Sequence, residues 1–233
     1  MLKKLISYAA TAAISLVLVA CSGGSSTTTD TVTIKKPTKA TIILVFGDSI
    51  SQGYGTNING VVYQQITPGN TYTELLRNKM QSENMAQYAP ITIINASLGS
   101  EFTDDAISRL PGLLAQYHPT HVLLAHGTND SGSDIPNSYI ANNFKTMIAM
   151  VQNSGAKALM ADVTFSLYGV DFGNAYSQMV QNVAASTGAA YVPLLSGVLA
   201  DSKYYLPDGF HLNDLAQPIM MNNVWNVLIP LLD

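Results

Sequence analysis

Apolar residues in this chain of 233 residues fall into two patterns that alternate along the sequence. Short uninterrupted apolar runs, several of them rich in β-branched residues, predict strands buried on both faces of a sheet; they span residues 41–46, 91–95, 121–125, 157–163 and 190–193. Between them, apolar residues recur every three or four positions, which predicts helices at residues 72–82, 104–117, 138–153, 174–187 and 214–232. We expect Pro111 to kink the second helix or to delay its start.

The regular succession of strand and helix indicates an α/β domain. Parallel strands joined by helices need cover on both faces, so the pattern predicts a three-layer α/β/α fold with a five-stranded parallel sheet. The expected strand order is 2-1-3-4-5, as in flavodoxin-like folds. Residues 54–70 and 166–173 lack either periodicity and predict loops, the first of them beside the end of the first strand, in the place of a partial lid.

The N-terminus has the organisation of an export signal. Lys3 and Lys4 precede an apolar run over residues 5–19, which is too short and too rich in alanine for a comfortable transmembrane span. The run leads into Cys21, which is followed by a serine and two glycines, and this resembles a bacterial lipoprotein signal. The alternative is an ordinary cleaved signal peptide in which the cysteine is incidental.

The resemblance to a lipoprotein signal implies three segments. Residues 1–20 are expected to be a signal peptide, residues 21–40 a flexible tether rich in Ser, Thr and Gly, and residues 41–233 the folded domain. Cys21 is expected to carry the lipid. We therefore expect an exported lipoprotein of the bacterial cell envelope, on the periplasmic face or the outer membrane, that meets the membrane through its lipid anchor.

Composition narrows the class of protein further. The chain is 47% hydrophobic and 11% charged, which suits one globular domain with a sizeable core, and a monomer is the default. A net charge of −4 argues against a nucleic-acid partner. The single cysteine leaves no internal disulfide. His118 and His121 have no carboxylate or cysteine beside them at ligand spacing, so no metal site is expected.

The first strand ends in a sequence suited to a nucleophile. Gly47, Asp48 and Ser49 follow the buried run directly, and open α/β sheets place their ligands at the carboxyl ends of strands. A serine hydroxyl needs an imidazole to take its proton, and the imidazole needs a carboxylate to fix its tautomer. The alternative is that Asp48 and Ser49 only form a turn.

The matching base and acid lie near the C-terminus. Asp208 and His211 are three residues apart in a turn that contains Gly209, so both side chains can face one cleft. The alternative is a surface turn followed by a helix cap at Asn213.

Hydrolysis through a serine also needs donors for the oxyanion. Asn129, after the third strand, offers a side-chain amide, and residues 95–100, after the second, offer a backbone N–H from a glycine turn. The backbone N–H of Ser49 completes the set. Three successive strand ends thus bring a serine and donors to one edge of the sheet.

These four blocks in this order resemble the SGNH, or GDSL, hydrolase family, and the segments 95–97, 109–111 and 208–218 resemble its bacterial thioesterase, lysophospholipase and arylesterase branch. The resemblance implies hydrolysis of small acyl esters, thioesters or lipids without metal or cofactor. It implies that Ser49 is the nucleophile, His211 the base and Asp208 the orienting acid. It further implies an oxyanion hole formed by Ser49, Asn129 and a residue of the second block.

Two positions depart from the pattern of that branch. Thr128 stands where a second glycine is usual and narrows the space beside Asn129. The second-block glycine usually falls five residues after the asparagine, but Gly99 falls four after Asn95 and Ser100 takes the fifth place. We expect Gly99 to supply the N–H, because a tight loop can need its freedom at positive φ, and keep Ser100 as the alternative.

Other residues have weaker assignments. Leu167 and Tyr168 are expected to form the wall that faces the acyl chain, because they are apolar or aromatic residues on a loop at the rim. His126 fits a packed residue at a strand end better than a supporting residue of the site, and Asp48 fits a brace of the nucleophile turn. Two other functions stay open: a carbohydrate O-deacetylase, and a binding lipoprotein without catalysis.

Overall fold

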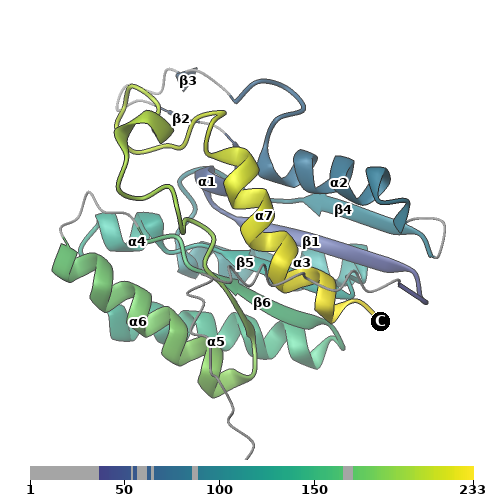
Figure 1. Cartoon of the computed structure of the whole chain (residues 1–233). Coiled ribbons are helices and arrows are strands. Elements are labelled where there is room, and N and C mark those ends of the chain that lie inside the picture. The colour runs from purple at the N-terminus through teal and green to yellow at the C-terminus, as the bar shows by residue number, and fades with distance from the viewer. Residues whose placement is uncertain (1–36, 54, 57–61, 64–65, 86–88, 165–169) are drawn as a thin grey trace, which may run out of the picture. The chain divides into compact units, whose positions relative to one another are not determined.

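The computed structural model describes residues 37–53, 55–56, 62–63, 66–85, 89–164 and 170–233. At its centre is a five-stranded parallel sheet in the order β4-β1-β5-β6-β7 (Figure 1). Its strands are β1 (Thr41–Gly47), β4 (Ile91–Asn95), β5 (His121–Ala125), β6 (Lys157–Ala161) and β7 (Ala190–Val192). Numbered along the chain, the order is 2-1-3-4-5, so the predicted fold class and strand order are confirmed.

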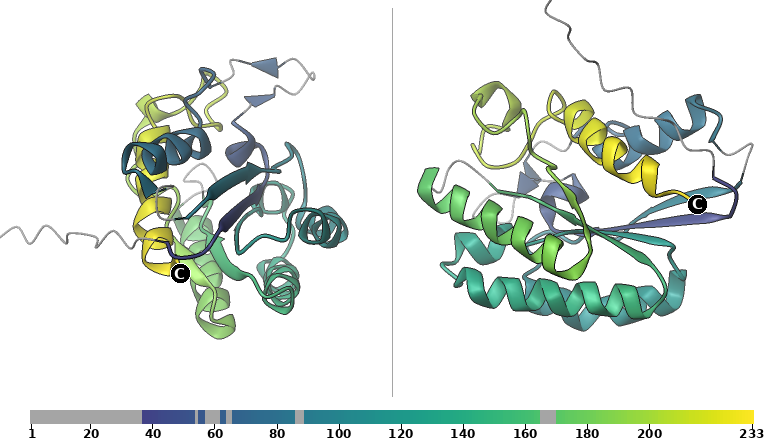
Figure 2. Two further views of the ribbon diagram at one scale, coloured as in Figure 1. Left: turned by 90° about the vertical axis from the view of Figure 1, so that its right-hand side faces the viewer. Right: turned by 60° about the horizontal axis from the view of Figure 1, so that its bottom comes forward.

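Helices cover both faces of this sheet, as Figures 1 and 2 show. On one face α2 (Tyr72–Ser82) packs against α7 (Gln217–Leu228). On the other face α5 (Asn137–Asn153) packs against both α3 (Thr103–Tyr117) and α6 (Val170–Thr187). The middle strands β1 and β5 are buried almost throughout, which explains why their sequences read as uninterrupted apolar runs. Among the described residues no helix is both long and apolar enough to cross a lipid bilayer.

Most predicted boundaries agree with the structure, and α2, β4 and β5 agree at both ends. Two predictions were wrong in detail, and a third was wrong in one of its two alternatives. α6 begins at Val170, so residues 170–173 are helical rather than part of a loop. α3 begins at Thr103 and runs through Pro111, so this proline does not delay the start of the helix; the kink stays a prediction. α7 begins at Gln217 rather than at residue 214, because Asn213 turns its side chain onto the Leu215 N–H, and it ends in the 3-10 helix η4 (Ile229–Leu231).

The sequence patterns did not predict several short elements. α1 (Ser49–Gln52) and α4 (Thr128–Gly132) each begin within two or three residues of a strand end. A small hairpin, β2 (Gly55–Thr56) with β3 (Val62–Tyr63), lies within the predicted loop 54–70. The 3-10 helix η3 (Ser202–Tyr204) precedes the segment of Asp208. Elements this short have no room for a periodic pattern and depend on caps and tertiary contacts.

Candidate active site

The nucleophile turn is shaped by the residues on either side of Ser49. A Cβ atom on Gly47 would lie 2.7 Å from the carbonyl oxygen of Ala125 on β5, so only glycine fits between the strands here. Asp48 is fully buried and its Oδ1 accepts the N–H of Ile50 at 3.0 Å, which caps α1. Burial raises the pKa of Asp48 above its ordinary value. Ser49 therefore stands at the first position of a helix that its neighbour holds in place.

The structure brings Ser49, His211 and Asp208 into one chain of hydrogen bonds. His211 Nε2 lies 2.9 Å from Ser49 Oγ, and His211 Nδ1 lies 2.8 Å from Asp208 Oδ2. A carboxylate only accepts, so Nδ1 carries the proton and Nε2 is free to accept the proton of the serine hydroxyl. Ser49 and His211 are each 8% exposed, so the pair is largely shielded from water.

Asp208 is held in its charged form. Burial raises the pKa of this carboxyl, but the N–H groups of His211 and Phe210, each 2.9 Å from Oδ1, and the imidazole outweigh that effect, so the pKa lies below its ordinary value. The backbone of His211 is anchored as well, since its carbonyl accepts from the Leu206 N–H at 2.7 Å, and the imidazole ring packs edge-on against Phe210. The base thus has a defined tautomer and orientation before any substrate arrives.

Two of the predicted oxyanion donors, Asn129 and the Ser49 backbone N–H, keep a hydrogen that no described residue accepts. Asn129 lies in the first turn of α4, and one hydrogen of its Nδ2 group is given to the carbonyl oxygen of Glu101 at 3.0 Å. That bond orients the amide and leaves its second hydrogen without a partner among the described residues. The backbone N–H of Ser49 likewise donates to no acceptor in the described part of the chain.

The turn of the second block corrects the reasoning that favoured Gly99. The Glu101 N–H bonds to the Leu98 carbonyl at 3.3 Å, which closes a turn over residues 98–101. The positive φ in this turn, 62°, belongs to Ser100, and Gly99 is not among the residues with positive φ. The Gly99 N–H donates to Gln52 Oε1 at 2.7 Å, whereas the Ser100 N–H has no acceptor among the described residues. The geometry therefore favours Ser100, the alternative, as the donor.

Comparison with known proteins decides the family. The model of the GDSL-like lipase/acylhydrolase family matches residues 45–217, which is more than half of the chain. The chain belongs to this family. It is therefore a GDSL serine ester hydrolase, and the residues gathered at the carboxyl edge of its sheet form its candidate active site.

Individual relatives agree with this membership. Over 195 residues the enzyme is 30% identical to a protein named esterase TesA from Pseudomonas aeruginosa, covering 83% of this chain and 90% of the relative. It is 28% identical over 178 residues to a protein named arylesterase from Vibrio mimicus, and the match covers 76% of this chain and 82% of the relative. A crystal structure of TesA superimposes with a TM-score of 0.72 at 30% identity, covering 82% of this chain and 99% of the other.

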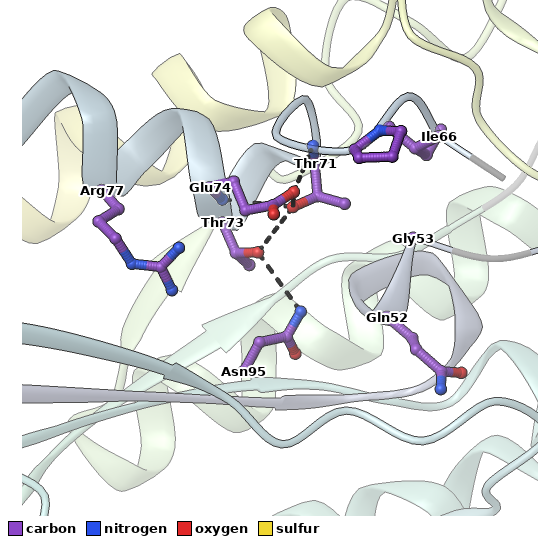
Figure 3. Close-up of a pocket in the computed structure, with 9 residues that line it drawn as sticks. Gln52, Gly53, Ile66, Thr71, Thr73, Glu74, Arg77 and Asn95 are labelled. Atoms are coloured by element: carbon purple, nitrogen blue, oxygen red, sulfur yellow. Dashed lines mark hydrogen bonds between the residues drawn. The ribbon is translucent and has the colours of Figure 1, made fainter.

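A polar cavity of about 360 Å³ lies beside the nucleophile helix of the GDSL hydrolase (Figure 3). Thr73 and Glu74 of α2 line it on one side and Asn95 at the end of β4 on the other, and Thr73 and Asn95 are hydrogen-bonded to each other. Gln52 also lines it, so this side chain joins the cavity to the Gly99 turn. None of the three residues of the serine–histidine–aspartate chain belongs to its lining.

The remaining predicted residues fall outside the site or outside the described ranges. Leu167, Tyr168 and Cys21 are not among the described residues. His121 lies at the start of β5, 2% exposed, with its Nε2 3.2 Å from the Leu231 carbonyl. In the described parts of the chain no three side chains of His, Cys, Asp or Glu lie close enough together to hold a metal ion.

Thr128 is buried at the start of α4, and its hydroxyl has no hydrogen-bond partner among the described residues. Its side chain is 3% exposed at the start of α4, and the preceding Gly127 takes the left-handed conformation with φ 107°. The tight position is Gly127, where a Cβ atom would lie only 2.0 Å from the hydroxyl of Tyr176. The place of the second glycine thus holds a buried threonine, and the close approach that requires a glycine is at Gly127.

Among the residues that the sequence analysis assigned no role, Asp214 links the histidine segment to the segment before α2. Asp214, three residues after His211, accepts from the Thr67 N–H at 3.1 Å, the Thr67 hydroxyl at 2.9 Å and Asn70 Nδ2 at 2.6 Å. These bonds fasten the segment before α2 to the histidine segment. No local pattern announces a contact across 147 residues of chain, which is why the sequence did not predict it.

Proposed function

We propose that this GDSL hydrolase cleaves acyl esters and thioesters through an acyl-enzyme on Ser49. The observation that carries the proposal is the continuous hydrogen-bonded chain from Ser49 through His211 to Asp208, at 2.9 and 2.8 Å. The names of relatives support this substrate class: they include an esterase, an arylesterase and, at 24% identity, a protein of Escherichia coli named thioesterase 1/protease 1/lysophospholipase L1.

The reaction proceeds in two acyl transfers. Ser49 Oγ attacks the acyl carbon while His211 Nε2 takes its proton, and the imidazolium is stabilised by Asp208. The tetrahedral intermediate collapses, and the alcohol or thiol leaves with the proton from Nε2. Water then attacks the acyl-enzyme by the same route, with His211 again accepting the proton, and the free acid departs from Ser49.

The oxyanion of each intermediate is assigned to three donors, the backbone N–H of Ser49, the backbone N–H of Ser100 and the side chain of Asn129. The support for each assignment is that the group has a hydrogen that no described residue accepts. Gly99 is a poorer candidate, because Gln52 already takes its N–H at 2.7 Å. Preorganised donors of this kind stabilise the transition state, in which the oxygen is charged, more than the neutral substrate.

Hydrolysis of p-nitrophenyl esters of graded chain length, and of an acyl thioester, tests the proposal. We expect turnover of both classes by the parent enzyme and none by Ser49→Ala beyond the uncatalysed rate. A Ser49→Ala variant that keeps the parent rate would end the proposal. In the same series, Leu167→Ala and Tyr168→Ala should shift the preferred chain length if these residues face the acyl chain.

The proposed cellular form is a monomeric exported lipoprotein anchored through Cys21, with residues 1–20 removed and residues 21–40 as a tether. Its support is the arrangement of Lys3 and Lys4, the apolar run and Cys21 in the sequence. Incorporation of a radiolabelled fatty acid into the parent protein, but not into Cys21→Ala, is the expected result. Equal labelling of both proteins would contradict it.

A further inference from the structure

Glu101 joins the two parts of the oxyanion hole that come from different elements. It follows Ser100 directly in the chain, and its own carbonyl oxygen accepts Nδ2 of Asn129 at 3.0 Å. Any shift of Glu101 therefore moves the Ser100 peptide and the Asn129 amide together. The residue is 4% exposed, so its carboxylate is placed where water cannot solvate it freely.

That buried carboxylate is held by two side chains from neighbouring elements. Arg109 on α3 binds it with both arms of its guanidinium, Nε to Oε1 at 2.6 Å and Nη2 to Oε2 at 2.5 Å. His126, at the end of β5, lies with Nε2 2.9 Å from Oε2. Burial raises the pKa of Glu101, but Arg109 and His126 outweigh it and hold the pKa below its ordinary value, so the carboxylate is ionised. We call Glu101, Arg109 and His126 the Glu101 cluster.

Arg109 and His126 also contact segments that lead to the candidate active site. Nη1 of Arg109 also donates to the Ala96 carbonyl at 2.8 Å, so this arginine closes the whole loop between β4 and Glu101. Its guanidinium lies 4.5 Å from the ring centre of Phe46, and the His126 ring lies 4.6 Å from the same ring at its edge. Phe46 belongs to β1 and stands three residues before Ser49.

We propose that the Glu101 cluster is a positioning device for the oxyanion hole, in which the charge of Glu101 and the fork of Arg109 set the places of the Ser100 N–H and the Asn129 amide. The inference rests on the proposed function, because it needs these two groups to be oxyanion donors. A bidentate pair between arginine and carboxylate fixes geometry as well as charge. It can therefore hold Ser100 at a φ of 62°, which a serine rarely adopts unaided.

The test replaces Glu101 by glutamine, which keeps its size and removes its charge. With p-nitrophenyl butyrate as substrate, we expect kcat per folded enzyme to fall about 10- to 100-fold, while KM stays within about two-fold of the parent value. The reason is that displaced hydrogen-bond donors lose more of their stabilisation of the transition state than of the bound substrate. The inhibition constant of butylboronic acid, whose adduct on the serine places an oxygen in the oxyanion hole, should rise in parallel with the loss of kcat.

The matched control is His121→Gln. His121 is a buried histidine at the opposite end of β5 from His126, and it bonds to the Thr120 hydroxyl and the Leu231 carbonyl. This variant should lose thermal stability but keep kcat and the boronate constant within about two-fold. Should Glu101→Gln fail to fold, Arg109→Lys, which keeps the positive charge and loses the fork, is measured with the same two readouts.

Three results would overturn the inference: a folded Glu101→Gln (or Arg109→Lys) enzyme with the parent kcat, a fall in kcat without a change in the boronate constant, or an equal fall in His121→Gln. Ser49→Ala is run beside them to separate this inference from the proposed function. Parent activity in Ser49→Ala defeats the function itself, whereas an inactive Ser49→Ala beside a fully active Glu101→Gln defeats only the role of the cluster.

Discussion

Replacing Asp208 by asparagine tests the serine–histidine–aspartate chain most sharply. Oδ2 of Asp208 bonds His211 Nδ1 at 2.8 Å, while Oδ1 accepts the N–H groups of Phe210 and His211 at 2.9 Å each. The amide oxygen of asparagine can keep the two backbone bonds, but its NH₂ group then faces Nδ1. The imidazole must accept there and carry its proton on Nε2, where it can no longer take the proton of Ser49.

The expected losses differ greatly between activity and stability. The same substitution in the chymotrypsin-type arrangement lowers kcat about 10⁴-fold, which corresponds to about 5.5 kcal/mol of transition-state stabilisation. The folded state keeps the hydrogen bonds of residue 208 and loses only their charge, so the free energy of unfolding should fall by about 1 kcal/mol. Asp208→Asn should therefore be a folded and almost inactive enzyme.

Initial rates with p-nitrophenyl butyrate give kcat, and urea unfolding gives the free energy of unfolding. Asp208→Ala, which also leaves the two N–H groups without their acceptor, should match the loss of kcat and lose about 1–2 kcal/mol more stability. Asp201→Asn is the control, because Asp201 pairs with Lys203 on the surface of the same segment and should leave kcat unchanged. A folded Asp208→Asn enzyme with more than a tenth of the parent kcat would refute the assigned tautomer.

Three further outcomes are expected. Ser100 has a φ of 62°, which strains a residue with a side chain, so Ser100→Gly should raise the free energy of unfolding by up to about 1 kcal/mol and keep kcat. A lower free energy of unfolding in urea would show that the backbone at this position is not strained. Asn129→Ala should lower kcat about 10²- to 10³-fold with little change in KM, and steady-state kinetics that show a change in KM alone would remove it from the oxyanion hole. Burial raises the pKa of Asp214, but the hydrogen bonds from Asn70 and Thr67 outweigh this effect and place the pKa below the ordinary value of 3.8. The ionised carboxylate therefore stabilises the folded state at pH values above 3.8, and this stabilisation is lost as the carboxylate protonates in acid. The Tm difference between the parent and Asp214→Asn should therefore shrink as the pH falls below about 4, and a difference that grows in acid has the wrong sign.

The sequence by itself determined the layered fold and the edge at which the site lies. Runs such as β5 are buried on both faces, so apolar residues must follow one another without interruption, and α2 carries one apolar face, so its apolar residues must recur at helical spacing. Both patterns are local and survive in the sequence. The carboxyl ends of parallel strands share one edge, which is why the sequence predicts Ser49 and Asn129 at one site.

Only the tertiary structure shows which residue of the second block takes the positive φ. Taken locally, a glycine is the better residue for a positive φ, and that argument selected Gly99. In the structure Ser100 takes the positive φ instead, because Gln52, 47 residues away, engages the Gly99 N–H, while Arg109 and His126 hold Glu101 on the other side. A left-handed serine costs about 1–2 kcal/mol, and contacts from three other elements offset that cost. No pattern along the chain records such contacts, since they exist only after the strands have brought these residues together.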